Sequence, residues 1–393
     1  MSQSQKIGGE IGEIRASIDV SKLNAYIEKF VPAICAPVVV KQFKFGQSNP
    51  TYFLTDVNSA TFVLRKKPAG QLLSNTAHQI EREYTMLNAL HQHNTNSSTT
   101  PERIVPIPKP YVLCEDNSVV GTPFYIMEYL DGRIFTDARM LEVSREARRE
   151  CWLSAVRALT ALSDLEPAAL GVSSFGPSTP YFPRQIKSLT RVSLVQAEAV
   201  DIETGQKTGK IPLFDEMVEW YQNHLPDERK TGLRVVHGDY KLDNLIFHPT
   251  ENRVIGILDW ELCTLGSPLA DFANLTQPWL IDPEMTVNAD GIPALLGFKN
   301  TDFEPANVDE LEREYCRLTN QPYPIAELLF ARSWMLFRLS VIAQGIAARY
   351  ARRQASSEKA SIYIDVFPIV GRLARIVLED GGAKLSLSAK AKL

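Results

Sequence analysis

Short apolar runs with a two-residue alternation dominate the first third of the chain. Such alternation is typical of strands that bury one face, and the Gly, Pro, Asn and Ser residues between the runs predict turns. Apolar residues instead recur every three or four positions in 20–30 and 76–91, which predicts two helices beside the strands. The predicted strands span residues 38–45, 51–57, 61–67, 111–114 and 122–130.

Helical periodicity prevails in most of the remaining chain. The last of these stretches is apolar enough to be buried, but Glu327, Arg332 and Arg338 within it exclude a membrane span. The chain therefore consists of a strand-rich part followed by a mainly helical part. The predicted helices span residues 145–165, 181–200, 214–224, 308–318 and 325–352.

The stretch 235–261, just past the middle, interrupts the helical pattern and carries the candidate chemistry. A polar loop holds Asp239 and Asn244, and two apolar runs follow, the second of which stops at Asp259. We interpret the two runs as a β-hairpin that brings the second aspartate back beside the loop. Two carboxylates and a carboxamide that converge in this way can bind Mg²⁺ on a nucleotide and orient an attacking hydroxyl.

Length, charge and cysteine content narrow the class of protein. The 393 residues suffice for two lobes with their own cores, and the net charge of −4 comes from acidic and basic residues mixed along the chain. This mixing gives no sign of a nucleic-acid surface. Five cysteines without a C-x-x-C pair indicate reduced thiols in an intracellular protein, not a zinc site or a disulfide framework. We find no signal peptide and no apolar run long enough to span a bilayer.

The motifs of the central stretch resemble those of a known family. The run HGDYKLDN, residues 237–244, is similar to the H-R-D-x-x-x-x-N catalytic loop of protein kinases, and the Asp of LDWE stands where the Asp of D-F-G would stand. The chain thus resembles the aminoglycoside phosphotransferase and choline-kinase-like branch of the protein-kinase fold. This implies an α+β, bilobal, protein-kinase-like fold with a flexible arm at 1–18, a β-rich N-lobe at 19–130, a mainly helical C-lobe at 131–385 and a tail at 386–393.

The resemblance implies ATP as the phosphoryl donor, held by two segments of the N-lobe. Backbone N–H groups of the turn between the first two strands would bind its phosphates, although an ordinary hairpin turn would have the same composition. The backbone of the hinge after the last strand would bond the purine edge. The residues assigned to ATP in these segments are Gly46, Gln47, Ser48 and Asn49 in the turn, and Met127, Glu128 and Leu130 in the hinge.

A basic residue on the third strand is also expected at the phosphates. Strand alternation makes Arg65 the positional match, with Lys66 on the other face as the alternative. In the family this base pairs with a helical carboxylate. We prefer Glu83 to Glu81 for that role, since EREY is similar to the corresponding run in relatives.

Mechanistically, the resemblance implies transfer of the ATP γ-phosphoryl group to a substrate hydroxyl. Asp239 would accept or orient the hydroxyl proton, while Asn244 and Asp259 would hold Mg²⁺. Lys241 would either neutralise charge at the γ-phosphate or lie in solvent, and the sequence leaves both alternatives open. His237 is expected to pack the loop through its ring N–H groups.

Two further resemblances bear on substrate and location. The C-terminal tripeptide Ala391-Lys392-Leu393 is a variant of the S-K-L address, so we expect its import receptor to carry the protein into the peroxisomal matrix, with the cytoplasm as the alternative. The runs FGQSNPTY, VLRKKP and EREY most resemble the kinase-like domains of certain acyl-CoA dehydrogenases, over about residues 20 to 350. This implies a hydroxyacyl-CoA or hydroxy acid, bound for β-oxidation, as the small-molecule acceptor.

Other functions stay open at this point. The single-glycine turn and Arg65 in place of lysine favour a nucleotide-binding pseudokinase acting as a regulatory partner. The complete set of Asp239, Asn244 and Asp259 favours an enzyme. An aminoglycoside or choline-type kinase is a further alternative. A protein kinase would carry an A-P-E run after the metal aspartate, and the sequence has none.

Overall fold

The computed structural model of the chain describes residues 11–14, 18–43, 49–68, 79–286, 292–355, 358–383 and 385. The chain divides into two compact units: Met1–Thr136, Pro167–Ser173 and His237–Cys263 form the first, and Asp137–Glu166, Ser174–Val236 and Thr264–Leu393 form the second. The catalytic segment His237–Cys263 therefore belongs to the first unit, whereas the predicted lobe boundaries place it in the C-lobe. Those boundaries, like the arm and the tail, stay predictions.

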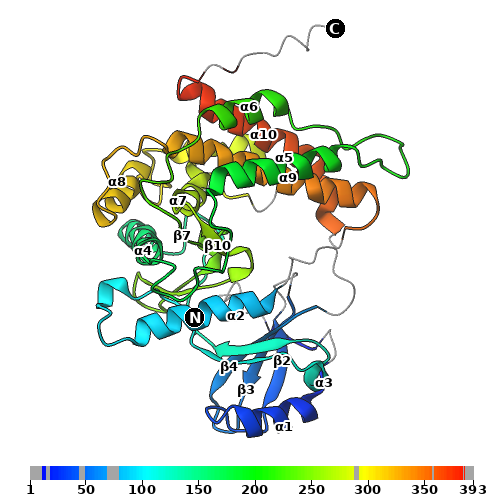
Figure 1. Cartoon of the computed structure of the whole chain (residues 1–393), viewed down its shortest axis with the longest axis vertical. Helices are drawn as coiled ribbons and strands as arrows, with labels where there is room; N and C mark the ends of the chain where they lie inside the picture. The colour runs from blue at the N-terminus through cyan, green and yellow to red at the C-terminus, as the bar shows by residue number, and fades with distance from the viewer. Residues whose placement is uncertain are drawn as a thin grey trace. The chain divides into compact units, whose positions relative to one another are not determined.

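The first unit is built on a six-stranded sheet in which all paired strands are antiparallel (Figure 1). Its spatial order is β1-β2-β3-β4-β6-β5. Two longer helices, α1 and α2, flank it. The strands are β1 Ile11–Gly12, β2 Val39–Phe43, β3 Thr51–Thr55, β4 Thr61–Lys66, β5 Pro110–Cys114 and β6 Phe124–Glu128, and the helices are α1 Val20–Phe30, α2 Ile80–Thr95 and α3 Asn117–Val120.

Helix α1 covers one face of this sheet. It begins where the Asp19 side chain accepts the Lys22 N–H at 3.1 Å, which satisfies one of the amides left without a partner at a helix start. Leu23 and Ile27, four residues apart, are fully buried and belong to one core cluster with apolar residues of the strands. Burying both side chains contributes about 3–6 kcal/mol, so this face of the sheet is firmly closed.

Alternation along β4 sorts its two basic residues. Phe62 and Leu64 lie in the core with α1, and Lys66, on the same face, is buried with its Nζ donating to the Val120 carbonyl at 2.7 Å. Arg65 projects from the opposite face. The strand pattern thus separates Arg65 from Lys66, as the sequence predicts.

A separate two-stranded β-hairpin, outside the six-stranded sheet, completes the first unit. It consists of β8 Leu245–Phe247 and β9 Val254–Ile257, flanked by the short 3₁₀ turns η2 Leu242–Asn244 and η3 Trp260–Leu262. The chain leaving β6 is fastened to this hairpin by reciprocal backbone bonds of 2.8 Å between Arg133 and Phe247. The close approach needs a glycine at position 132, because a Cβ on Gly132 would lie 2.4 Å from the Phe247 carbonyl oxygen.

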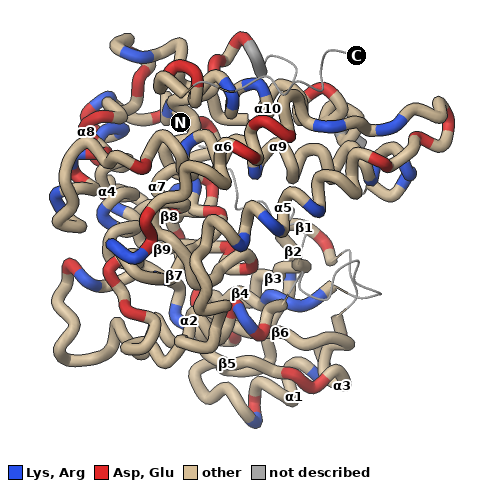
Figure 2. The backbone as a smooth tube through the Cα atoms, turned by 45° about the horizontal axis from the view of Figure 1, so that its top comes forward, with Lys and Arg blue, Asp and Glu red and all other residues tan. Residues whose placement is uncertain are grey.

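The second unit is mainly helical, with a two-stranded antiparallel ribbon of β7 and β10. Its two longest apolar helices, α9 and α10, pack side by side (Figure 1), and the hydroxyl of Ser340 donates to the Phe367 carbonyl between them at 2.6 Å. Lys and Arg are interspersed with Asp and Glu along the described chain (Figure 2). The elements are α4 Arg145–Ser163, α5 Tyr181–Ala197, α6 Phe214–Asn223, β7 Arg234–Val236, β10 Thr264–Gly266, α7 Leu269–Leu275, α8 Val308–Leu318, α9 Leu328–Ala351 and α10 Tyr363–Asp380.

Some predicted boundaries and elements differ from the structure. The helix predicted to reach residue 200 ends at Ala197, because Val200 pairs with Lys207 in a β-bridge. The helix predicted from residue 325 begins at Leu328, and the one predicted over 76–91 runs from Ile80 to Thr95. Helices α7 and α10 were not predicted. Within the described residues, no helix is both long and apolar enough to cross a bilayer.

Candidate active site

The catalytic loop is held against the β8–β9 hairpin by one residue, Leu258. Its N–H donates to the Asn244 carbonyl at 2.8 Å, and its carbonyl accepts the ring Nε2–H of His237 at 2.8 Å. The other ring nitrogen of His237 accepts the Asp239 N–H at 3.2 Å, which defines the tautomer. The ring is fully buried, so His237 has the structural role predicted for it. Because Asp259 directly follows Leu258, the loop and the second aspartate are positioned together.

Asp239 is oriented by its neighbours in the same loop. The Asn244 carboxamide donates to the Asp239 Oδ2 at 3.0 Å and to its backbone carbonyl at 2.9 Å. The Lys241 Nζ lies 3.3 Å from the same Oδ2 and 3.5 Å from Asp243. Burial by itself would lower the pKa of Lys241, but these two carboxylates outweigh it and raise the pKa, so the ammonium stays charged. The Lys241 side chain is half-exposed and ion-paired. It therefore matches neither alternative alone, because its ammonium lies partly in solvent and partly against the carboxylate of Asp239.

Gly238 has a backbone that other residues adopt with difficulty. Its φ is +85°, and a Cβ there would lie 2.6 Å from the Leu262 carbonyl oxygen. The arginine of H-R-D loops therefore has no room at this position. The Trp260 ring, also buried, packs edge-on against His237 with 4.8 Å between centroids.

Arg65 connects β4 to the metal-site aspartate. Its Nη2 lies 2.6 Å from Asp259 Oδ1 and 3.9 Å from Glu261 Oε2, and its Nε lies 3.2 Å from Glu83 Oε2. Burial by itself would lower the pKa of Arg65, but the surrounding carboxylates raise it, so the guanidinium is permanently charged. The structure thus brings three predicted site residues, Arg65, Glu83 and Asp259, into direct contact.

Glu83 is the buried partner of this base. Tyr125 donates its hydroxyl to Glu83 Oε2 at 3.0 Å, and the glutamate is 1% exposed. Burial raises the pKa of Glu83 to about 7, against the lowering effect of Arg65. The alternative, Glu81, instead lies 3.6 Å from Lys67 at the surface end of the strand.

The residues assigned to the turn and the hinge are placed in part. Gly46, Gln47 and Ser48 lie outside the described residues. Asn49 is described, and its carboxamide points into the ion-paired cluster, with Nδ2 3.1 Å from Glu83 Oε1 and 3.4 Å from Glu261 Oε2.

The hinge is a regular end of β6. Met127 is buried between β4 and β5, opposite Val63. The Glu128 N–H already donates to the Lys109 carbonyl at 2.8 Å, and its carboxylate accepts the Lys109 N–H at 3.1 Å. The Glu128 amide is therefore not a free donor for a purine. A methyl group of Leu130 lies against Gly256, where a Cβ would be 2.4 Å from it.

Oxygen donors for a cation are concentrated beside Arg65. Oxygens of Glu83, Asp259 and Glu261 lie within 4.8 Å of one another, and oxygen is the donor that Mg²⁺ prefers. Asn244 and Asp259, the predicted ligand pair, stand at the two ends of the hairpin. These ends are neighbours, because the Asn244 carbonyl accepts the N–H of Leu258, the residue before Asp259. Carboxylate oxygens therefore lie beside Asp259 on the Arg65 side, where the guanidinium pairs with them, and Asn244 belongs to the segment bonded next to Asp259.

Sequence reasoning missed three contributions to this site. Glu261 entered only as part of the LDWE run, Tyr125 only as part of a strand, and the side chain of Asn49 was not considered. A carboxylate two positions after a metal-site aspartate was the available signal for Glu261, because that spacing can return the side chain to the same site. Tyr125 gave no comparable signal.

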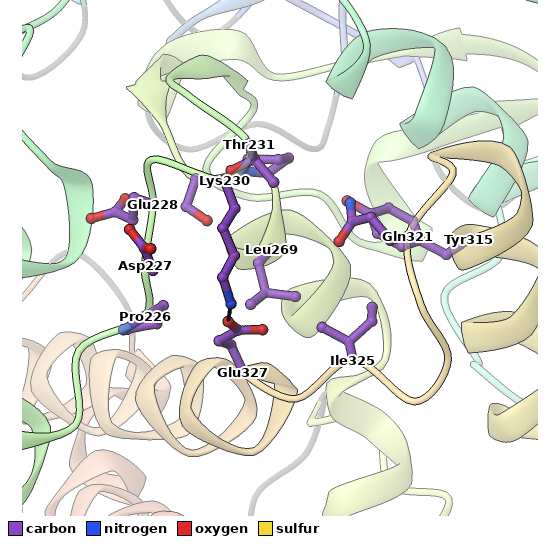
Figure 3. A pocket seen from close by; sticks show the side chains of 12 residues that line it. Pro226, Asp227, Glu228, Lys230, Thr231, Leu269, Tyr315, Gln321, Ile325 and Glu327 are labelled. Atoms are coloured by element: carbon purple, nitrogen blue, oxygen red, sulfur yellow. Dashed lines mark hydrogen bonds and ion pairs between the residues drawn. The ribbon is translucent and has the colours of Figure 1, made fainter.

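The second unit contains a separate small pocket, part of it open to solvent (Figure 3). Lys230 and Glu327 form an ion pair of 2.6 Å across it. Glu228 accepts the N–H groups of Tyr181 and Phe182, at 3.0 and 3.2 Å, at the start of α5. Its charged groups are thus paired within the protein, and none of the predicted site residues lines it.

The fold and the site define the class of protein. A β-rich unit with Asp239 in a polar loop, a strand arginine paired to a helical glutamate, and Asp259 after a hairpin has the arrangement of a kinase-like phosphotransferase. The chain belongs to the phosphotransferase enzyme family, whose model matches residues 39–311. It is thus a phosphotransferase that acts on hydroxyl groups, as predicted.

Solved structures share this fold. A "putative aminoglycoside phosphotransferase" from Ralstonia eutropha is 32% identical and aligns with a TM-score of 0.76, covering 93% of this chain and 99% of that one. The ternary complex of streptomycin, ATP and APH(2″)-IIa is 16% identical, with a TM-score of 0.50 over 84% of this chain and 90% of that one. These alignments confirm the predicted α+β, kinase-like fold.

Full-length relatives are larger. Acyl-CoA dehydrogenase family member 11 of Gallus gallus is 36% identical over 347 residues, which is 87% of this chain and 41% of that protein. The chain spans about two fifths of the length of the curated relatives it matches. The predicted resemblance to acyl-CoA dehydrogenases is confirmed at the level of sequence.

Proposed function

We propose that the protein transfers the γ-phosphoryl group of ATP to the hydroxyl of a hydroxyacyl-CoA or a hydroxy acid. The observation that carries the reaction type is the joint placement of Asp239, Asn244 and Asp259 by Leu258, with Arg65 on the second aspartate. The relatives named acyl-CoA dehydrogenases support the acyl part of the proposal, because in them a matching segment belongs to a protein named for acyl-CoA oxidation.

Asp239 is the group that accepts the hydroxyl proton. Its carboxylate is already held by Asn244 and by the charged Lys241, so it meets the acceptor without having to reorient. Positioned general-base catalysis contributes roughly 10²–10⁴-fold to such a reaction. Lys241 offsets negative charge next to this base.

Arg65 is the cation available for the nucleotide phosphates on the β4 side. Its planar guanidinium matches phosphate oxygens. Glu83 pairs with its Nε, and Tyr125 holds Glu83 in place by a hydrogen bond. Asn244 and Asp259 are the residues that would hold Mg²⁺, which supplies charge screening between the phosphate oxygens and the acidic loop. The ATP in the APH(2″)-IIa complex, a protein of the same fold, supports ATP as donor.

The test is turnover on a panel of acceptors. Purified protein is incubated with Mg²⁺-ATP and hydroxyacyl-CoAs, hydroxy acids, choline, homoserine or aminoglycosides, and ADP release and product mass are measured. We expect ADP formation with the hydroxyacyl class, reduced by about 10²–10⁴-fold in Asp239→Asn.

Two results would change the proposal. Turnover with choline or aminoglycosides alone would refute the acyl substrate and retain the kinase. Tight nucleotide binding without turnover on any acceptor would favour the pseudokinase.

We also propose a peroxisomal location on the basis of Ala391-Lys392-Leu393, which lies outside the described residues. The test compares a chain tagged at its N-terminus, with the tripeptide intact, with the same chain lacking it. Co-localisation with a peroxisomal marker only when the tripeptide is present is the expected result. A cytoplasmic distribution of both chains would refute it.

A further inference from the structure

Asn49 is the most deeply placed neutral polar side chain of the ion-paired cluster. It lies just before β3, is 1% exposed, and its Nδ2 donates to Glu83 of α2 and to Glu261 of η3. Its Oδ1 is buried and has no donor among the residues that the structure describes. An unpaired buried acceptor costs about 1–3 kcal/mol, so the two bonds of Nδ2 must offset this cost.

The cluster needs a donor that adds no charge. Three carboxylates, from Glu83, Asp259 and Glu261, surround the single guanidinium of Arg65 within 4 Å. Like charges at this distance repel, so the two glutamates would move apart or away from the arginine if Arg65 alone held them. The two N–H bonds of one neutral carboxamide hold both glutamates at once. They also connect segments that are 34 and 212 residues away in the chain.

We propose that Asn49 is a positioning residue that, through Glu83 and Glu261, fixes the guanidinium of Arg65 in the orientation that binds the nucleotide phosphates. This role belongs to the side chain and differs from the backbone contact that the sequence predicts for the turn. The inference rests on the proposed function, because Arg65 must meet phosphate for its orientation to matter. In this role Asn49 itself touches only protein groups.

The expected effect is specific for the phosphates of the ligand. In Asn49→Ala the two glutamates lose their shared donor, and Arg65 is free to follow either of them. An arginine that is no longer aligned loses a charge-assisted hydrogen bond to a phosphate, which corresponds to about a tenfold weaker affinity. We therefore expect the Kd of MgATP to rise about tenfold, while the Kd of adenosine, which lacks phosphates, stays within twofold of the unmodified protein.

Two further variants make the test independent of folding. Thr51→Val removes the hydroxyl that donates to the Asn49 backbone carbonyl at 3.0 Å, so it perturbs the same residue without touching a carboxylate, and both dissociation constants should be unchanged. Glu261→Gln alters a partly exposed side chain, and we expect it to weaken MgATP binding in the same direction. The double variant of Asn49→Ala and Glu261→Gln should show no more than the larger single effect, because both act through one contact.

The measurement is a titration of each variant with MgATP and with adenosine, followed by tryptophan fluorescence or calorimetry. A selective loss of MgATP affinity, absent in Thr51→Val, supports the inference. Equal losses of affinity for MgATP and adenosine would refute the inference. An unchanged affinity for MgATP in Asn49→Ala, or in Glu261→Gln, would also refute it. The proposed function would stand in each of these cases. Failure of the unmodified protein to bind MgATP would overturn the proposed function and this role together.

Discussion

Gly238 provides the sharpest test of how the catalytic loop is built. Replacing it with alanine places a Cβ on a residue with φ of +85°, 2.6 Å from the Leu262 carbonyl oxygen. The left-handed backbone costs a residue with a Cβ about 1–2 kcal/mol. Moving the loop away from the Leu262 carbonyl oxygen adds about 1–3 kcal/mol. The loss of stability should therefore be about 2–5 kcal/mol. The next residue, Asp239, must move with the loop, and a displacement of about 1 Å can cost 10²-fold in turnover.

Two other glycines separate these contributions. Gly121 has the same kind of backbone, with φ of +87°, but a Cβ there meets nothing within 4 Å, so Gly121→Ala should cost about 1 kcal/mol from the backbone alone. Gly256 has no positive φ, and its Cβ would meet only a methyl group of Leu130, which can rotate away. Gly256→Ala should therefore cost about 1–2 kcal/mol. Both variants should keep the geometry of the catalytic loop.

The assay is denaturant unfolding of the three variants, together with the rate of ADP formation under saturating substrates. We expect Gly238→Ala to be the least stable and the only one with a large loss of kcat. Equal stability of Gly238→Ala and Gly121→Ala, with unchanged kcat, would show that the Leu262 carbonyl does not constrain the loop, and the reasoning would fail.

Three more outcomes follow from the contacts described above. Lys66→Met removes the bond from the buried ammonium to the Val120 carbonyl, on the face of β4 away from the ion-paired cluster. Initial-rate kinetics should therefore show less than a threefold change in the KM for ATP. A tenfold rise would place Lys66 at the phosphates instead. Tyr125→Phe removes the hydroxyl bonded to Glu83 and should cost about 1–3 kcal/mol in denaturant unfolding, whereas a neutral result would show that this bond adds nothing to stability. The pKa of Asp201 is lowered to about 2 by the N–H groups of the following turn, so its contribution to stability is present above about pH 4 and disappears as the pH falls through about 2. Unfolding of Asp201→Asn between pH 2 and 6 should therefore lack this part of the pH dependence, and parallel curves for the two proteins would contradict the assignment.

Local patterns predicted the elements whose signals lie within a few residues. Helix α1 was predicted with its observed bounds, because apolar residues recur at helical spacing from Val20 to Phe30. The Asp239 loop could be recognised since its function needs a fixed spacing within a single turn. Arg65 and Lys66 could be assigned to opposite faces because strand alternation alone decides that question.

What the sequence did not reveal depends on distant contacts. Asn49 and Glu261 are 212 residues apart in the chain but form a hydrogen bond. Nothing in the sequence of the turn or of the D-W-E run indicates that the two segments meet. Helix α10 was missed for a different reason. It has no capping side chain at its start, where Ile362 occupies the N-cap, and Pro368 lies inside it, so both local indicators argue against a helix. Packing against α9 outweighs them.

The two backbone bonds of Leu258 have a consequence for inhibitor design. In this chain the N–H and the carbonyl that precede Asp259 are both bonded to the catalytic loop, so the aspartate cannot swing outward on its own. A compound that requires such an outward state would have to break two buried hydrogen bonds and displace the His237 ring, at a cost of several kcal/mol of its own affinity. Selective ligands for this enzyme should therefore be sought among molecules that compete with the nucleotide or with the acceptor, and screening libraries can be chosen on that basis.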